Sequence, residues 1–142
     1  MTFYEITCLV AGLFHLLLTV FVVSRDISSK ANRAYAVWGF SLALWNLAAY
    51  MKLQVPQDPD DSTASEPWIR FIHLGLVFLP VGIFHLCLII SEVRNRQLLP
   101  VLYAIHVALA GTVLFGDWYI HDHKHTAFGW FAIPGPAFYV YT

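Results

Sequence analysis

Charged side chains are scarce in this chain of 142 residues. Lys, Arg, Asp and Glu together make up 12% of it, which is about half the share found in soluble domains, whereas 58% of the residues are hydrophobic. The net charge is -1 and no stretch is rich in Lys or Arg, so we expect no nucleic acid or other polyanion as a partner. The composition excludes an ordinary soluble domain and favours a membrane protein.

Sequence motifs for catalysis and for covalent haem attachment are absent as well. The chain has no CxxCH sequence, no glycine-rich phosphate loop and no Ser-His-Asp series. Its two cysteines, Cys8 and Cys87, fall near opposite faces of the predicted membrane, too far apart for a disulfide, which needs Cα atoms within about 7 Å. We therefore expect a protein that is not an enzyme.

Four apolar segments are long enough to cross a bilayer. Each has at least 18 residues, and at about 1.5 Å of rise per residue this length crosses a hydrocarbon core of roughly 30 Å. The segments are residues 6–23, 34–51, 69–90 and 98–115, followed by a short apolar end at 136–142. We predict an all-α, polytopic bundle of four transmembrane helices in a single membrane domain, 1–142. The end at 136–142 resembles the first turns of a further helix, so the domain is either truncated or completed by a partner.

Basic residues are shared unequally between the two ends of these segments. One end has Arg25, Lys30, Arg33, Arg94 and Arg96, and the other has Lys52, Arg70 and Lys124 together with most of the acidic residues. Because Lys and Arg are retained on the cytoplasmic side, we expect the N-terminus to be external. Arg70 lies one turn inside the third segment and is expected to extend toward the nearer interface.

Four histidines lie within the apolar segments, at positions 15, 73, 85 and 106. His15 and His106 fall at similar depths near the midplane, so we consider them a facing pair that could bind a haem iron axially. A single imidazole, such as that of His85, could instead bind a chlorophyll-like pigment. The alternative is that each histidine is neutral and hydrogen-bonded to a backbone carbonyl, a Ser or Thr hydroxyl, or Asn46 across a helix interface.

A second histidine cluster follows the fourth segment. His121, His123 and His125 alternate with Asp122 and Lys124, and in an extended chain alternate side chains project to one side. Three imidazoles could then converge on Zn, Cu or Ni, so this cluster predicts an external transition-metal site. The alternative is a solvated loop whose histidines cap helix ends or contact lipid headgroups.

Several stretches resemble a known membrane region. They are NRAYAVWGFSLALWNLAAY, PWIRFIHLGLVFLPVGIFHLCLII, LLPVLYAIHVALAGTVLF and the closing GWFAIPGPAFYVYT. In this order they are similar to the N-terminal seven-helix region of bacterial sensor histidine kinases, from its first helix to the start of its fifth. The resemblance implies a signal-input module in the bacterial inner membrane, with its N-terminus outside and no catalytic residues in this part.

Two functions follow from these observations. The first is a noncatalytic membrane module that receives a signal or docks through its helices. The second is an accessory structural subunit of a large respiratory or photosynthetic membrane complex, in contact with haem, pigment or lipid. In either case the expected partners are the lipid bilayer and either other membrane subunits or the remainder of a longer chain. A kinase in the same reading frame would favour the first function, and stable partners with cofactor absorbance the second.

Overall fold

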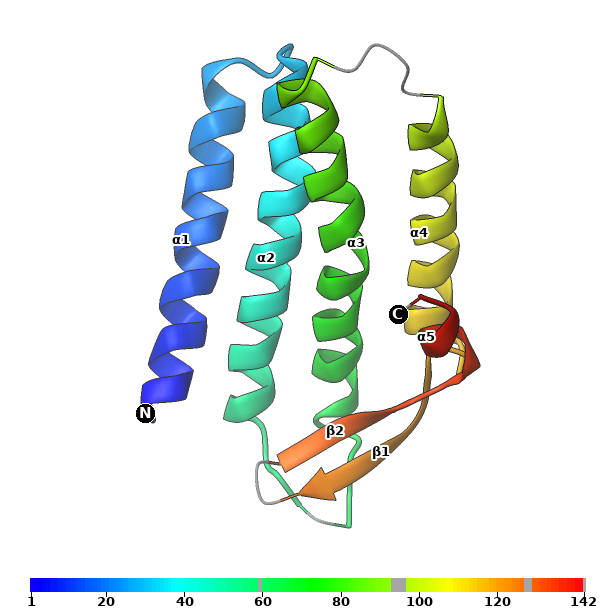
Figure 1. Cartoon of the computed structure of the whole chain (residues 1–142). Helices are drawn as coiled ribbons and strands as arrows, with labels where there is room; N and C mark the ends of the chain where they lie inside the picture. The colour runs from blue at the N-terminus through cyan, green and yellow to red at the C-terminus, as the bar shows by residue number, and fades with distance from the viewer. Residues whose placement is uncertain (59, 93–96, 127–128, 142) are drawn as a thin grey trace.

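Four long helices stand side by side in the computed structural model, with a strand pair and a short helix at one end (Figure 1). The structure describes all residues except 59, 93–96, 127–128 and 142, so Arg94 and Arg96 of the predicted cytoplasmic side lie outside the described residues. The elements are α1 (Phe3–Arg25), α2 (Lys30–Gln54), α3 (Glu66–Ile90), α4 (Leu98–Phe115), β1 (Ile120–Thr126), β2 (Gly129–Pro134) and α5 (Pro136–Tyr141).

Side-chain hydrogen bonds define the turn between α1 and α2. The Asp26 carboxylate accepts bonds from the Ser28 hydroxyl at 2.6 Å and the Ser28 backbone N–H at 2.9 Å, and these bonds hold the pKa of Asp26 below its usual value. Asn32, in the first turn of α2, donates to the carbonyl oxygens of Val22 and Asp26 at 3.0 and 2.9 Å. The end of α1 is therefore capped by a side chain of α2.

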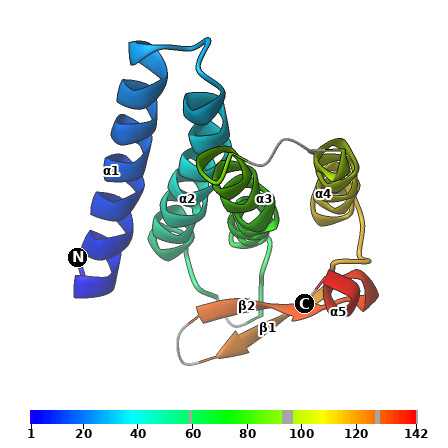
Figure 2. The same ribbon diagram turned by 45° about the horizontal axis from the view of Figure 1, so that its top comes forward.

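Small residues let α2 approach both of its neighbours. A Cβ atom at Gly75 would lie 2.8 Å from the carbonyl oxygen of Ser41, and one at Gly82 would lie 2.9 Å from the Trp38 backbone. Gly12 on α1 is packed equally closely against Leu47. In lipid there is no hydrophobic driving force between helices, so close contacts of this kind provide much of the attraction that holds the helices together. As a result α1, α2, α3 and α4 lie in sequence order, with α1 and α4 on opposite sides (Figure 2).

Three helices are long and apolar enough to cross a membrane, namely α1, α3 and α4. Their large exposed apolar side chains, such as Leu17 on α1 and Val107 on α4, suit contact with lipid tails. The prediction of a fourth crossing helix is not confirmed, because α2 is not among these candidates within the described residues. Ser41 and Asn46 reduce its hydropathy, and its position between α1 and α3 buries much of its surface.

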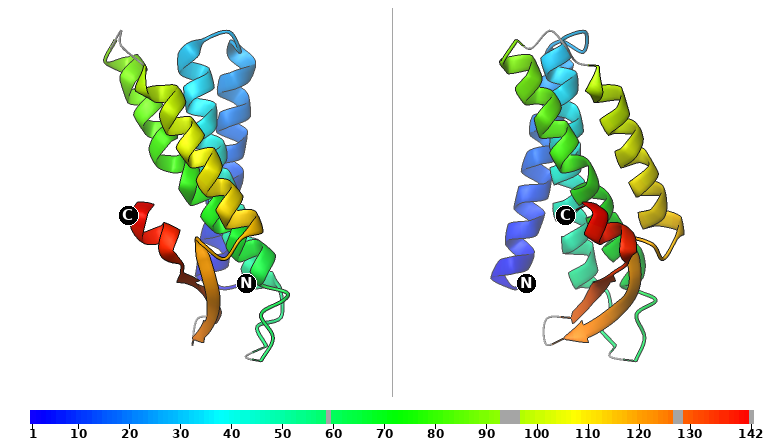
Figure 3. Two further views of the ribbon diagram at one scale, coloured as in Figure 1. Left: turned by 90° about the vertical axis from the view of Figure 1, so that its right-hand side faces the viewer. Right: turned by 45° about the vertical axis from the view of Figure 1, so that its right-hand side comes forward.

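The all-α prediction is wrong after α4, because β1 and β2 form an antiparallel two-stranded sheet. His125 pairs with Trp130, and Lys124 with Phe131. From Asp122 to His125 exposed and partly buried residues alternate along β1, as expected for a strand with one protected face. The aromatic residues of β2 favour strand pairing. The pair extends across the ends of α2 and α3 in the view of Figure 1, and the left view of Figure 3 shows it beside these ends, on the same side as α5.

The main core lies where this hairpin meets α3 and α4. Its buried members include Val77, Val113, Tyr119 and Trp130, with Phe138 of α5 packed against them. The chain reverses after β2 through backbone hydrogen bonds, from Gly135 N–H to the Tyr119 oxygen and from Ala137 N–H to the Trp118 oxygen. The apolar end predicted to begin a helix therefore forms α5 beside the base of the bundle.

Candidate functional site

A cavity of about 1020 Å³ lies at the hairpin end of the molecule. It is enclosed by the start of α1, the end of α2, the start of α3 and the hairpin. Most of its wall is apolar, and its side chains with polar groups include Thr2, Tyr4, Glu5, Lys52, Gln57, His73, His125 and Thr126. Ligand sites typically have this size, with apolar walls and a few polar groups. The cavity is therefore the candidate binding site.

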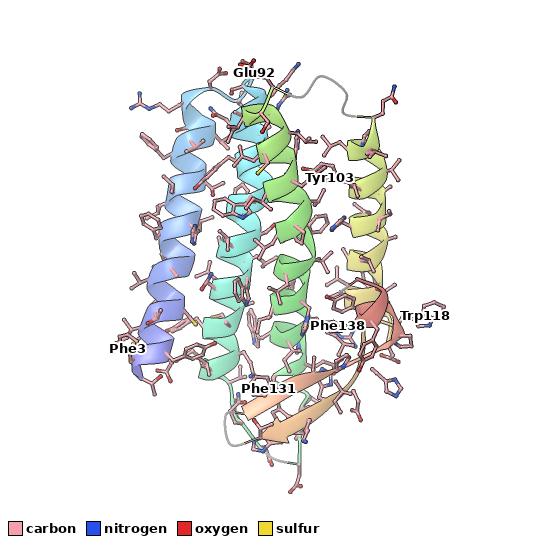
Figure 4. All side chains as sticks on the ribbon, viewed as in Figure 1. Phe3, Glu92, Tyr103, Trp118, Phe131 and Phe138 are labelled. Carbon is pink, nitrogen blue, oxygen red and sulfur yellow. The ribbon has the colours of Figure 1, made fainter. Side chains whose placement is uncertain are left out.

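Lys52 is the basic residue of this cavity. Its side chain extends from the last turn of α2, its exposed fraction is 7%, and its Nζ atom lies 4.2 Å from the centroid of the Phe131 ring. Figure 4 shows Phe131 at the end of β2 that passes beneath α2. Among the described residues no carboxylate forms an ion pair with Lys52. A cation with so little exposure needs a compensating anion more than an exposed one does.

Glu5 is the acidic side chain of the same cavity, and its hydrogen bonds are local. Its carboxylate accepts a bond of 2.9 Å from the Thr2 backbone N–H, and the Thr2 hydroxyl accepts one of 3.3 Å from the Glu5 N–H. These reciprocal bonds form a capping box at the start of α1. Glu5 is therefore engaged in capping its own helix.

Gln57 fixes the cavity wall between α2 and the hairpin. Its Nε2 group donates to the Lys52 carbonyl oxygen at 2.8 Å and to the Ser65 hydroxyl at 3.2 Å, while its Oε1 accepts from the Trp130 N–H at 3.4 Å. The Trp130 indole also donates to the Asp58 carbonyl oxygen at 2.9 Å. The acidic loop between α2 and α3 is therefore bonded to the hairpin.

Two histidines contribute to the cavity from different elements. The His73 ring packs edge-on against Tyr119, with centroids 5.6 Å apart, and the His125 ring packs edge-on against Trp130 at 5.2 Å. Nδ1 of His73 is buried and has no hydrogen-bond partner among the described residues, and the same is true of Nε2 of His123 nearby. Among the residues that line the cavity, His73 thus has an imidazole nitrogen with unused hydrogen-bonding capacity.

The predicted facing pair of His15 and His106 is wrong. His15 belongs to α1, where its ring lies edge-on to Trp38 of α2 at 6.3 Å, whereas His106 belongs to α4. Since α2 and α3 separate these two helices (Figure 2), the two imidazoles do not face each other in this chain, and haem binding by either histidine stays a prediction. Equal depth along two segments does not make the segments neighbours.

His106 makes a contact that the alternative predicted, whereas His85 contacts a tyrosine hydroxyl, a partner that the alternative did not name. Nδ1 of His106 is 2.7 Å from the Leu102 carbonyl oxygen, which confirms a backbone carbonyl partner for this residue. Nδ1 of His85 is 3.0 Å from the Tyr103 hydroxyl, linking α3 to α4. Pigment binding by a single imidazole, including His85, stays a prediction.

The three histidines of the predicted metal site lie on β1, and so the extended conformation expected for them is confirmed. However, the strand register shifts between Ile120 and Asp122, at His121. A register shift of this kind disturbs the alternation of side chains, and His121 is exposed whereas His123 and His125 are partly buried. No group of three or more His, Cys, Asp or Glu side chains within the described residues is arranged to hold a metal ion.

Sequence reasoning missed Lys52, Gln57 and Trp130 as site residues. Lys52 was counted only as a charge at one end of the membrane, and Gln57 belongs to a loop for which no site was predicted. A usable signal was the position of Lys52 between the apolar residues Met51 and Leu53, just beyond the apolar segment 34–51, since a Lys next to apolar residues must either extend to water or find a specific partner.

The geometry defines a helical membrane protein with a cavity at one end, and a strand pair forms one wall of that cavity. Residues 7–142 match the family described as the N-terminal 7TM region of histidine kinase. The chain belongs to this family, and it is therefore a membrane module of the sensory input type. No curated protein and no solved structure shows significant similarity to it. Nothing in these comparisons supports the alternative of an accessory subunit.

Proposed function

We propose that this chain receives a chemical signal in the cavity at its hairpin end and passes it on through its helices. The observation that carries the proposal is the cavity itself, which has contributions from α1, α2, α3 and both strands. A ligand there would contact all of these elements at once and could change their relative positions. In a sensory input module, such a change would be the signal.

The contact between α2 and α3 provides a path along the bundle. Gly75 and Gly82 on α3 pack against the α2 backbone at Ser41 and Trp38, and α2 also supplies Lys52 to the cavity. Because closely packed helices move as units rather than deform continuously, a shift at the cavity would reach the opposite end of α2.

We also propose that the module lies in the bacterial inner membrane with the hairpin outside. Arg25, Lys30 and Arg33 are at the end opposite the hairpin, which favours a cytoplasmic position for that end. The lipid bilayer is the first expected partner, and the second is the remainder of a longer chain that contains the output domain. Residues 1–142 would then belong to one membrane domain that does no catalysis itself.

Cysteine labelling tests the orientation. Ser28→Cys and Lys124→Cys, each in the full-length protein with Cys8 and Cys87 replaced by Ala, place one thiol at each end of the bundle. In intact cells we expect a membrane-impermeant maleimide to label the Lys124→Cys protein, and to label the Ser28→Cys protein only after permeabilisation. The reverse pattern would overturn the orientation.

A cavity-filling substitution tests signal reception. Ala49 lines the cavity, so Ala49→Trp would occupy part of it, whereas Phe40→Trp on the same helix adds bulk at an exposed position. We expect Ala49→Trp to change autophosphorylation of the full-length protein in membranes by about fivefold or more, and Phe40→Trp to leave it unchanged. Wild-type activity in a folded Ala49→Trp protein would contradict the proposal. The proposal would also be contradicted if the full-length protein neither contained a kinase domain nor bound a kinase.

A further inference from the structure

The chemistry of the cavity points to the class of molecule that it binds. We propose that it holds an amphipathic ligand with one anionic head group, bound at Lys52, and an apolar body packed among the aromatic side chains of the hairpin. This inference rests on the proposed sensory function and adds a ligand class to it. It is argued from the burial of Lys52, the nature of the walls and the neighbouring donors.

The head-group site is Lys52. A side chain that is 7% exposed has lost most of its hydration, and within the described part of the chain it has no carboxylate partner at ion-pair distance. The face of Phe131 at 4.2 Å offers partial compensation through its quadrupole, and the ammonium protons that do not face the ring remain available for an acceptor. An anionic oxygen is the group that would satisfy them best.

The surrounding polar groups agree with an anion rather than a cation. His73 and His125 line the same cavity, and an imidazole N–H can donate to an anion. The carboxylate of Glu5 is already bonded to the start of α1 through Thr2. A cationic ligand would have to lie close to Lys52, and the repulsion would be strong in so apolar a site.

The apolar body of the ligand is inferred from the walls. Trp45, Ile69, Ile72 and Trp130 line the cavity, and its volume of about 1020 Å³ is at the upper end of the range for small-molecule sites. A small inorganic anion would leave most of this apolar surface uncovered. An alkyl chain or a similar apolar group would cover it, and burial of that group would supply most of the affinity.

Bromine quenching of tryptophan fluorescence provides the test, because Trp45 and Trp130 line the cavity. The full-length protein in nanodiscs of zwitterionic lipid is titrated with a brominated twelve-carbon fatty acid. We expect saturable quenching above the background from lipid partitioning, and we expect it to be lost when Trp45 and Trp130 are both replaced by Phe. The matching brominated alcohol should bind about tenfold more weakly or worse.

Variants at Lys52 test the head-group site. Lys52→Met should weaken fatty-acid binding by about tenfold or more, Lys52→Arg should retain binding, and Lys30→Met at the other end of α2 should not affect it. Ala49→Trp, which fills the cavity without changing its charge, should also abolish saturable quenching. Equal affinity for the acid and the alcohol, unchanged binding in Lys52→Met, or no saturable quenching in the wild type would overturn the inference.

The same experiments separate this inference from the proposed function. Binding that depends on Lys52 without any effect on autophosphorylation would leave the ligand class standing and contradict signal reception. Altered autophosphorylation in Ala49→Trp, together with no saturable fatty-acid binding to the wild-type protein, would support signal reception and overturn the ligand class.

Discussion

Arg70 donates a hydrogen bond of 2.7 Å from Nη1 to the carbonyl oxygen of Val113. The same group also donates to the Gly116 oxygen at 3.2 Å, and the guanidinium is held by Glu66 on its own helix, with Nη2 2.9 Å from Oε1. The last carbonyl oxygens of a helix have no intrahelical donor. Arg70 supplies donors to two carbonyl oxygens at the end of α4. Arg70 thus extends toward the nearer end of the bundle, as expected, and there it also forms a specific link between α3 and α4.

Removal of this link should destabilise the bundle. We expect Arg70→Leu to lower the free energy of unfolding in detergent by about 3 kcal/mol, since bonds to a charged donor are lost and buried carbonyl oxygens lose their partners. Denaturant unfolding followed by circular dichroism measures the change. Arg33→Leu, at an exposed position, is the matched control, and an equal loss in both variants would contradict the capping role of Arg70.

The glycines of α3 should be intolerant of even a methyl group. Gly75→Ala and Gly82→Ala each place a Cβ atom within 3.0 Å of the α2 backbone, so we expect each to destabilise the protein by roughly 1–3 kcal/mol. Gly111→Ala on α4 is the control, because nothing lies within 4 Å of its added Cβ. Thermal unfolding should show Gly111→Ala to be neutral or slightly stabilising, and the same loss in all three variants would argue against close α2–α3 packing.

The hairpin that forms one wall of the cavity should become more mobile when Gln57 is replaced. Gln57→Leu removes donors to Lys52 and Ser65 and the acceptor for the Trp130 N–H. We expect hydrogen exchange of the Trp130 amide to accelerate by about tenfold, since one local bond of about 1 kcal/mol or more is lost along with its neighbours. Gln54→Leu, at an exposed position one turn earlier, should leave exchange unchanged. Equal rates in the two variants would show that Gln57 does not hold the hairpin.

The turn between α1 and α2 should make stability depend on pH. Because bonds from Ser28 lower the pKa of Asp26 in the folded protein, its stabilising effect is present above the unfolded pKa of about 4 and is lost as pH falls through the folded pKa. Asp26→Asn should therefore lower the thermal midpoint more at pH 7 than at pH 3, because the stabilising effect of the charged carboxylate is lost as the wild-type group becomes protonated. Asp60→Asn serves as the control, and an equal effect of Asp26→Asn at both pH values would contradict this account.

The helices were largely predictable from hydropathy, although their ends were not. The first apolar segment, 6–23, became α1 at Phe3–Arg25, because the capping box of Thr2 and Glu5 starts the helix before the apolar residues begin. Similarly, α2 extends to Lys30 at one end and Gln54 at the other. Hydropathy reports where a segment can meet lipid, whereas capping side chains decide where a helix begins and ends.

The hairpin was the main element that sequence reasoning missed. Between Ile120 and Thr126 its first strand has only His, Asp and Lys rather than the usual strand formers, and it is stabilised by pairing with Trp130 and Phe131 a few residues later. Gly129 enters β2 with a φ of 90°, a conformation that favours glycine. The alternation of residues indicated an extended chain, but only pairing with β2 made it a strand.

By itself, the sequence determined that the protein is a helical membrane module, because apolar length and the placement of charge are local properties. It also identified the family resemblance and the unusual number of histidines. Only the tertiary structure decided which polar residues meet. It placed His15 and His106 on helices that α2 and α3 separate, and it brought Lys52, His73 and Phe131 to one cavity. The physical reason is that neighbours in a bundle are chosen by helix packing and by the hairpin that closes one end, neither of which depends on position along the chain alone.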